Sequence, residues 1–125
     1  MKFLVDTCGW IEYMANASLA NKFAPYLKHL NKLVIPTIVQ FELYRWICRE
    51  KDESEALNII GLTEQCEVIP LNTSIALYAA DLAKLHGLAM ADAIVYATGM
   101  QYQAKIVTCD AHFVDFPQVE YFSTS

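Results

Sequence analysis

Residues 2–7 read KFLVDT, a short apolar run that ends in an aspartate and a threonine. Such a run predicts a buried strand, and the polar pair after it predicts the start of a helix over residues 8–15, with Thr7 as its N-cap. The pattern returns near the end of the chain, where residues 105–110 read KIVTCD. Asp6 and Asp110 therefore each follow the carboxyl end of a predicted strand.

Strands and helices alternate between these two segments. The other strands are expected at residues 33–35, 68–69 and 119–122, and the other helices at residues 18–31, 37–50, 54–64, 74–86 and 90–103, with a charged turn at 51–55. The expected boundary residues are Ser18 and Thr73 as N-caps, Pro25 near a first turn, Pro36 at a helix start and Gly87 just past a helix end.

This alternation predicts an α/β fold. We expect one domain over residues 1–125, with a central, mostly parallel sheet of four to five short strands, joined by right-handed crossovers and flanked by helices on both faces. The chain has 125 residues, of which 55% are apolar and 18% charged, so it can bury a full core.

Charge and cysteine content narrow the class of protein. The net charge of −5 argues against a domain that binds nucleic acid by bulk charge alone. It does not exclude a nuclease, because bound cations would offset acids in a site.

Asp6 interrupts the N-terminal apolar run too early for a secretory signal, and no stretch reads as a membrane span, so we expect a cytoplasmic protein. The four scattered cysteines predict reduced thiols.

Most of the fourteen acids occupy places where a carboxylate costs little, such as the charged turn. Asp6 and Asp110 differ, because they follow buried strands at the sheet edge where open α/β proteins build their sites. For each of these two, an equally open interpretation is a helix N-cap.

Glu42 and Asp92 are placed on predicted helices among apolar residues. The residues three and four positions from Glu42 are Ile38, Val39, Arg45 and Trp46, a mostly apolar face. Asp92 is the only formally charged side chain between Leu85 and Ala104. A lone carboxylate in such surroundings is costly unless it is paired, although a first-turn helix-dipole role would explain part of Asp92.

A shared divalent cation would explain all four acids, because it removes the repulsion between clustered carboxylates. Oxygen ligands select hard cations, so Mg²⁺ or Mn²⁺ is expected at Asp6, Glu42, Asp92 and Asp110. The chemistry expected of such a site is hydrolysis of a phosphodiester. A zinc site that includes Cys8, Cys109 and His112 is not favoured, because standard zinc spacing is missing.

The segments that carry these acids resemble a PIN domain. They are Leu4-Val5-Asp6-Thr7, Phe41-Glu42-Leu43, Ala91-Asp92-Ala93-Ile94 with Ala97-Thr98, and Thr108-Cys109-Asp110-Ala111-His112-Phe113. In their order and spacing they are most similar to the VapC type of toxin ribonuclease from bacterial toxin–antitoxin pairs.

The resemblance implies an endoribonuclease that depends on Mg²⁺ or Mn²⁺, with Asp6, Glu42, Asp92 and Asp110 as catalytic and metal-binding residues. Thr7 and Thr108 match supporting hydroxyl positions of the family, and Asp115 corresponds to an extra acid that some members use. The resemblance also implies a homodimer, a cognate antitoxin protein and a structured RNA substrate such as tRNA.

Three alternatives stay open beside this interpretation. A receiver-type signalling domain would need an acceptor aspartate after the third strand, where Pro70-Leu71-Asn72 stands instead. A D-x-D phosphatase is disfavoured by Cys8. A PIN-like scaffold that only binds partners is disfavoured by the complete set of four acids.

Arg45, Arg49 and Lys51 are candidates for RNA backbone contacts or for a solvated helix end. Trp10, Tyr13, Tyr44 and Trp46 are candidates for the core, a dimer face or an antitoxin groove.

Overall fold

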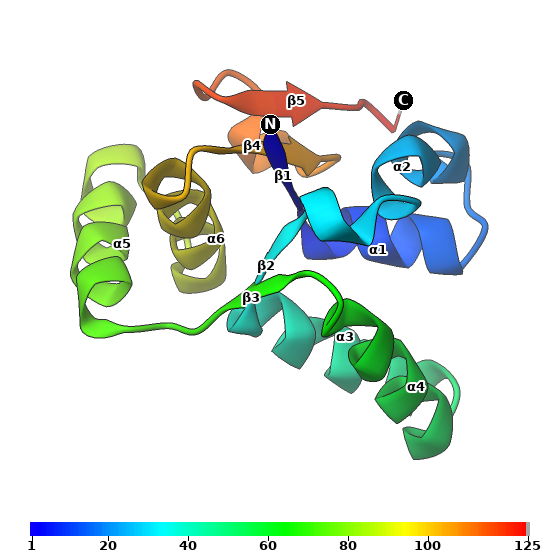
Figure 1. Ribbon diagram of the computed structural model, residues 1–125. Helices are drawn as coiled ribbons and strands as arrows, with labels where there is room; N and C mark the ends of the chain where they lie inside the picture. The colour runs from blue at the N-terminus through cyan, green and yellow to red at the C-terminus, as the bar shows by residue number, and fades with distance from the viewer. Residues whose placement is uncertain (125) are drawn as a thin grey trace.

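The computed structural model describes residues 1–124 and consists of five strands, six α-helices and two short 3₁₀ helices over that range (Figure 1). The strands are β1 (Lys2–Val5), β2 (Val34–Pro36), β3 (Glu67–Ile69), β4 (Ala104–Thr108) and β5 (Val119–Tyr121). The helices are α1 (Thr7–Met14), α2 (Ala20–Leu27), α3 (Thr37–Glu50), α4 (Glu53–Thr63), α5 (Thr73–His86) and α6 (Met90–Gln101), with η1 (Leu30–Lys32) and η2 (Ala111–Phe113).

All strand pairings in this part of the chain are parallel. One sheet has the order β1-β4-β5 and a second consists of β2 and β3. A single parallel bridge between Phe3 and Leu33 connects the two sheets beside β1, which gives the continuous order β3-β2-β1-β4-β5. The expected parallel α/β fold is confirmed, with the refinement that its strands form a three-stranded and a two-stranded sheet.

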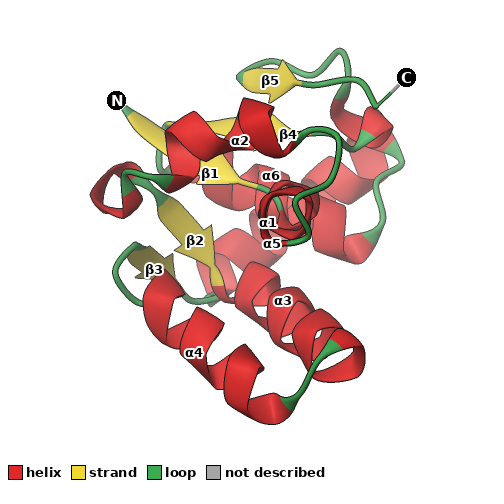
Figure 2. Ribbon diagram, turned by 90° about the vertical axis from the view of Figure 1, so that its right-hand side faces the viewer, coloured by secondary structure: helices red, strands yellow, loops and turns green. Residues whose placement is uncertain are grey.

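The helices form three pairs, α1 with α2, α3 with α4, and α5 with α6. Figures 1 and 2 show α1 and α2 on one face of the larger sheet and α5 and α6 on the opposite face, while α3 and α4 extend from the β2–β3 end. Covering both faces is what buried parallel strands require, because neither face can remain in water.

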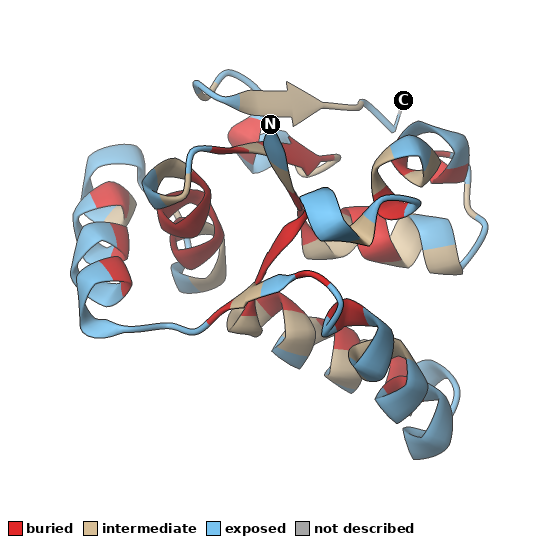
Figure 3. Cartoon of the chain, viewed as in Figure 1, coloured by how far each residue is buried: buried red, intermediate tan, exposed pale blue. Residues whose placement is uncertain are grey.

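The core lies between the sheet and these helices (Figure 3). Leu4, Val5, Ile106 and Val107 of the two central strands are at most 1% exposed. Helix α6 is buried from Ala93 to Gly99, which accounts for its long uncharged sequence. Within residues 1–124, no helix is long and apolar enough to cross a membrane.

Two expected N-caps lie one residue away from the observed ones. Asp6, not Thr7, caps α1, with its Oδ1 accepting from the Thr7 backbone N at 2.8 Å. Asn72, not Thr73, caps α5, with its Oδ1 accepting from Ile75 N at 2.9 Å. In both cases the preceding residue has the extended backbone and the short oxygen-bearing side chain that a cap needs. Gly87 follows α5 with φ 68°, the left-handed conformation expected of it.

Three other boundary expectations were wrong. Helix α2 begins at Ala20, one residue later than a Ser18 cap would place it, with Leu19 at the N-cap position and no side-chain cap, and Pro25 lies inside the helix beyond its first turn. The charged segment expected as a turn at 51–55 begins α4, with Asp52 as its cap. Acids at a helix N-terminus are stabilised by the helix dipole, so this segment favours a helix start.

Candidate metal-binding site

Asp6 lies at the centre of the candidate site, where β1 ends and α1 begins. Its Oδ1 caps α1 and its Oδ2 accepts from the Thr108 hydroxyl at 3.0 Å. The residue is 6% exposed. The pKa of Asp6 is raised to about 6, mainly by burial; the hydrogen bonds from Thr7 N and Thr108 lower it, and the charges of Asp92 and Asp110 raise it.

Thr108 is the last residue of β4 and connects the two strand-end acids. While its hydroxyl donates to Asp6, its Oγ1 accepts from the Asp110 backbone N at 2.9 Å. The residue is fully buried. Because β1 and β4 are adjacent and parallel, their carboxyl ends meet at one edge, and this hydroxyl fixes the spacing of the acids there.

Glu42 reaches the same region from α3. Its Oε1 accepts from the Thr7 hydroxyl at 2.6 Å, which connects two helices across 35 positions of sequence. Since Asp6 already supplies the cap, the Thr7 hydroxyl is available for this contact. Glu42 is partly exposed and lines a cleft of the surface.

Asp92 lies in the first turn of α6, and Asp110 caps η2. The His112 ring Nδ1 lies 3.1 Å from Asp92 Oδ2 and 3.2 Å from Asp110 Oδ1. One ligand atom from each of these three residues lies within 4.8 Å of the other two. Burial raises the pKa of Asp92, as do the nearby charges of Asp110 and Glu42, whereas the contact with His112 lowers it.

These interactions connect all four acids singled out in the sequence. Asp6 interacts electrostatically with Asp92 and Asp110, Asp92 also with Glu42, and Thr7 and Thr108 are the hydroxyls that hold the arrangement. Asp115 is different: it is exposed, beyond η2, and is not part of this cluster in the described chain. Over residues 1–124, His112 is the only basic side chain within ion-pair distance of the four carboxylates.

The chemistry of the donor set fits a hard divalent cation. Asp92 and Asp110 lie together with one exposed histidine to balance them, and Asp6 and Glu42 interact electrostatically with this pair, so the repulsion between the acids is compensated poorly by the protein itself. Asp6 Oδ1 accepts from Thr7 N, Oδ2 accepts from the Thr108 hydroxyl and at 3.7 Å from Cys8 Sγ, and the carboxylate keeps further lone-pair capacity. Carboxylate oxygens are the ligands that Mg²⁺ and Mn²⁺ prefer.

Two clefts adjoin the acids. One, of about 160 Å³, is lined by Thr7, Ile11, Glu42, Arg45, Trp46 and Arg49. The other, of about 280 Å³, is lined by residues 86–89 with Asp92 and His112. Glu42 and Asp92 therefore each line a hollow of the surface.

Two features of this region were not predicted from the sequence. One is the contact of His112 with Asp110, for which the position of His112 two residues after that acid is the sequence signal. The second is a contact between Cys8 and Cys109, in which the Cys109 backbone N donates to Cys8 Sγ at 3.3 Å. The interaction of the two thiols raises the pKa of Cys8 and lowers the pKa of Cys109. Cys8 lies two residues after Asp6, and Cys109 lies between Thr108 and Asp110. Both positions can be read from the sequence.

Comparison with known families identifies the class of protein. The PIN domain model matches residues 3–119, which is nearly the whole chain. The protein therefore belongs to the PIN domain family. The comparison with curated proteins found no match.

Solved structures with the same fold are distant in sequence. A toxin–antitoxin complex from Klebsiella pneumoniae is 18% identical with a TM-score of 0.82, covering 98% of this chain and 99% of that one. DNA-bound VapBC from Salmonella typhimurium is also 18% identical, with a TM-score of 0.72 and 98% of each chain covered. VapC20 from Mycobacterium tuberculosis, described as a sarcin-ricin loop cleaving toxin, is 13% identical with a TM-score of 0.70, covering 98% and 90%. At these identities the likeness establishes the fold.

Proposed function

We propose that this protein is a divalent-metal-dependent endoribonuclease and the toxin of a toxin–antitoxin pair. The observation that supports the proposal is that Asp92 and Asp110 lie together at His112, their only basic partner within residues 1–124, and interact electrostatically with Asp6 and, for Asp92, with Glu42. A purely structural role does not account for four such acids, because like charges held together oppose folding.

In this proposal the four carboxylates hold Mg²⁺ or Mn²⁺. When bound, such an ion supplies positive charge for phosphate oxygens and lowers the pKa of a water for attack on phosphorus. The role of Thr108 and Thr7 is to orient Asp6 and Glu42 through hydrogen bonds of 3.0 and 2.6 Å. Partners of this kind fix the direction in which a carboxylate presents its oxygens, and their loss usually weakens metal binding.

RNA is the substrate that the adjoining cleft supports best. Arg45 and Arg49 line it beside Glu42, so a phosphate next to the scissile one has two cations within the same hollow. Trp46 lines the cleft too and offers a surface on which an unpaired base can stack. These local cations compensate for the net charge of −5, which disfavours attraction of RNA by the whole molecule.

A larger cleft next to this one supports the antitoxin partner. Met14, Ala15, Trp46, Ile47 and Ile59 line it, with Lys51 and Glu55 also present, at the meeting of α1, α3 and α4. An apolar groove with charges at its margin suits the apolar face of a partner helix. Trp10 does not line this cleft, since it is 3% exposed and belongs to the core.

The proposal further includes a homodimer, as the family resemblance implies.

The nuclease is tested by the single substitution Asp92→Asn, which keeps the side-chain shape and removes the charge. We expect purified parent protein to cleave single-stranded RNA with Mn²⁺ or Mg²⁺ and to stop after EDTA treatment, and Asp92→Asn to be inactive but folded. The matched control is Asp81→Asn on the exposed surface of α5. Cleavage by Asp92→Asn at the parent rate would overturn the assignment.

Metal binding has a readout that does not depend on RNA. A ligand that binds only the folded chain raises its melting temperature, so Mn²⁺ should stabilise the parent and the Asp81→Asn control more than Asp92→Asn. Equal shifts in all three proteins would count against the four-carboxylate site. The toxin role is tested separately by expression in bacteria, where growth should arrest and recover when the protein encoded by the adjacent gene is co-expressed.

A further inference from the structure

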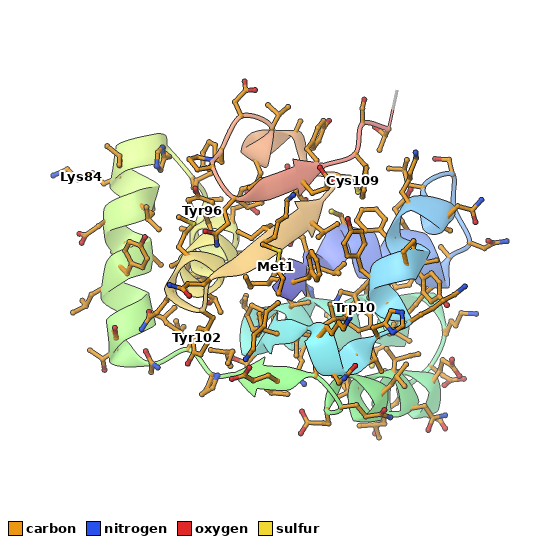
Figure 4. All side chains as sticks on the ribbon, turned by 45° about the horizontal axis from the view of Figure 1, so that its top comes forward. Met1, Trp10, Lys84, Tyr96, Tyr102 and Cys109 are labelled. Carbon is orange, nitrogen blue, oxygen red and sulfur yellow. The ribbon has the colours of Figure 1, made fainter. Side chains whose placement is uncertain are left out.

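Cys8 and Cys109 form a pair beside the acid cluster that the proposed nuclease chemistry does not use. Cys8 is the second residue of α1, and Cys109 directly follows β4, where Figure 4 labels it. The backbone N of Cys109 lies 3.3 Å from Cys8 Sγ, and the two thiol groups interact with each other. The residues are 101 positions apart, so only the pairing of β1 with β4 brings them together.

We propose that Cys8 and Cys109 form a reversible intramolecular disulfide that acts as a redox-sensitive modification site of this protein. A disulfide requires two β-carbons about 4 Å apart and an S–S bond of about 2 Å. The observed contact places the sulfur of Cys8 3.3 Å from the backbone N of Cys109, and in this proposal the bond forms by rotation of the two side chains. Both residues are partly exposed.

The oxidant in this proposal is a low-molecular-weight disulfide such as oxidised glutathione. One cysteine sulfur attacks the disulfide, forms a mixed disulfide and releases one molecule of reduced thiol. The second cysteine sulfur then attacks the protein-bound sulfur, forms the Cys8–Cys109 bond and releases the second reduced thiol. The protein is oxidised by two electrons, the glutathione disulfide is reduced, and both thiol protons end on the released molecules.

The bond would alter the surroundings of the strand-end acids. In the reduced protein, Cys8 Sγ lies 3.3 Å from the Thr108 hydroxyl and donates to Asp6 Oδ2 at 3.7 Å. Moving this sulfur onto Cys109 removes both contacts and ties the start of α1 to the residue before Asp110. If the proposed nuclease function is correct, the spacing of Asp6 and Asp110 changes and cleavage slows. This functional part of the inference rests on that proposal, whereas formation of the bond does not.

Bond formation is tested on the full, EDTA-treated chain. Reduced protein is incubated with oxidised glutathione, free thiols are blocked, and peptides are identified by mass spectrometry without reduction. We expect a peptide that joins Cys8 to Cys109, lacks two hydrogens and disappears after dithiothreitol treatment. The cross-link should also raise the melting temperature by about 10 °C, because it constrains a long loop of the unfolded chain. Cys109→Ser should lose the cross-link, and Cys48→Ser should keep it.

Other outcomes of the same experiment would contradict the proposed disulfide. Stable glutathione adducts on Cys8 or Cys109 without a cross-link, or no reaction at either cysteine, would overturn the inference. Cross-linking through Cys48 or Cys66 in place of the named pair would do the same.

Activity separates the two proposals. Oxidised parent protein should cleave RNA about a hundredfold more slowly, the usual effect of a displacement of roughly 1 Å in a site, and dithiothreitol should restore the rate. Treatment of a double variant, Cys8→Ser with Cys109→Ser, with the same oxidant should leave its rate unchanged. An oxidised parent that is cross-linked but cleaves at the reduced rate would refute the regulatory effect. Reduced protein that never cleaves RNA would refute the nuclease and leave the cross-linking result standing.

Discussion

The hydroxyl of Thr108 donates to Asp6 Oδ2 across 3.0 Å, although the two residues are 102 positions apart in the chain. The same oxygen accepts from the Asp110 backbone N at 2.9 Å. One fully buried hydroxyl thus fixes the acid that follows β1 and the acid that follows β4. Its position depends on the parallel register of these two strands, in which Val5 lies opposite Val107.

Replacing this hydroxyl should disturb the acids without changing the shape of the side chain. Thr108→Val removes a donor to buried Asp6 and an acceptor for Asp110 N, so we expect a loss of about 1–3 kcal/mol in the free energy of unfolding. The pKa of Asp6 should rise further, because the hydrogen bond from Thr108 lowers it. Mn²⁺ binding should weaken about 10–100-fold, as for other lost partners of metal-binding side chains. Urea unfolding and calorimetric titration measure the two effects.

Thr98→Val is the matched control for this experiment. Thr98 is also a buried threonine, but its hydroxyl donates to Ile94 O within α6. We expect this variant to bind Mn²⁺ as the parent does. Parent-like metal affinity in Thr108→Val would show that the hydroxyl does not organise the acids.

Neutralising Asp6 should stabilise the metal-free protein above pH 6. The pKa of Asp6 is about 6 in the folded chain against 3.8 in the unfolded chain, so the folded state holds the proton more tightly. Stability therefore falls as pH rises from about 4 to about 6 and stays reduced above that, by about 3 kcal/mol at most. Asp6→Asn has no such penalty and should unfold at higher urea concentration than the parent at pH 8 in EDTA.

The sign of this effect is checked by lowering the pH. The advantage of Asp6→Asn over the parent should shrink towards pH 4, where the parent carboxyl is protonated in the folded state. Asp81→Asn, which changes an exposed acid, should show no advantage that depends on pH in this way. An advantage of Asp6→Asn that is equal at pH 4 and pH 8 would contradict the assignment of the raised pKa to Asp6.

The arginines of the small cleft should affect RNA binding and not bond cleavage itself. For Arg49→Gln we expect KM for RNA to rise with little change in kcat, since in the proposed function this cleft-lining cation contacts a phosphate away from the scissile one. The slope of log affinity against log salt concentration should decrease by about 1. Lys84→Gln on the exposed surface of α5 serves as the control. An unchanged salt slope in Arg49→Gln would place the RNA elsewhere.

Two glycines should respond in opposite ways to alanine. A Cβ at Gly99 of α6 would lie 2.7 Å from Cγ1 of buried Ile106, so Gly99→Ala should destabilise the fold by about 1–3 kcal/mol. A Cβ at Gly61 of α4 would have nothing within 4 Å. Gly61→Ala should therefore stabilise by about 0.5–1 kcal/mol through helix propensity. Thermal unfolding of both variants tests how closely α6 packs on β4, and equal shifts would contradict that packing.

Local sequence signals account for the elements that position the site. The apolar runs before Asp6 and Asp110 predicted β1 and β4, and the helical periodicity of residues 37–50 predicted α3 with its observed bounds. The chemistry of the acids was visible for the same reason, because a carboxylate within apolar sequence stands out wherever the chain later folds. Helix starts were less well predicted: Thr7 and Thr73 each follow a better capping residue, Asp6 and Asn72.

The sequence by itself determined the alternation of strands and helices and the four acids that need a shared partner, since hydrophobic periodicity and the cost of an isolated charge are local properties. Only the tertiary structure decided which groups meet. The strand order β3-β2-β1-β4-β5, the Thr7–Glu42 contact, the Thr108 hydroxyl between two acids and the Cys8–Cys109 pair all join segments far apart in the chain. These contacts depend on how whole strands and helices pack together, and no short window of residues encodes that packing.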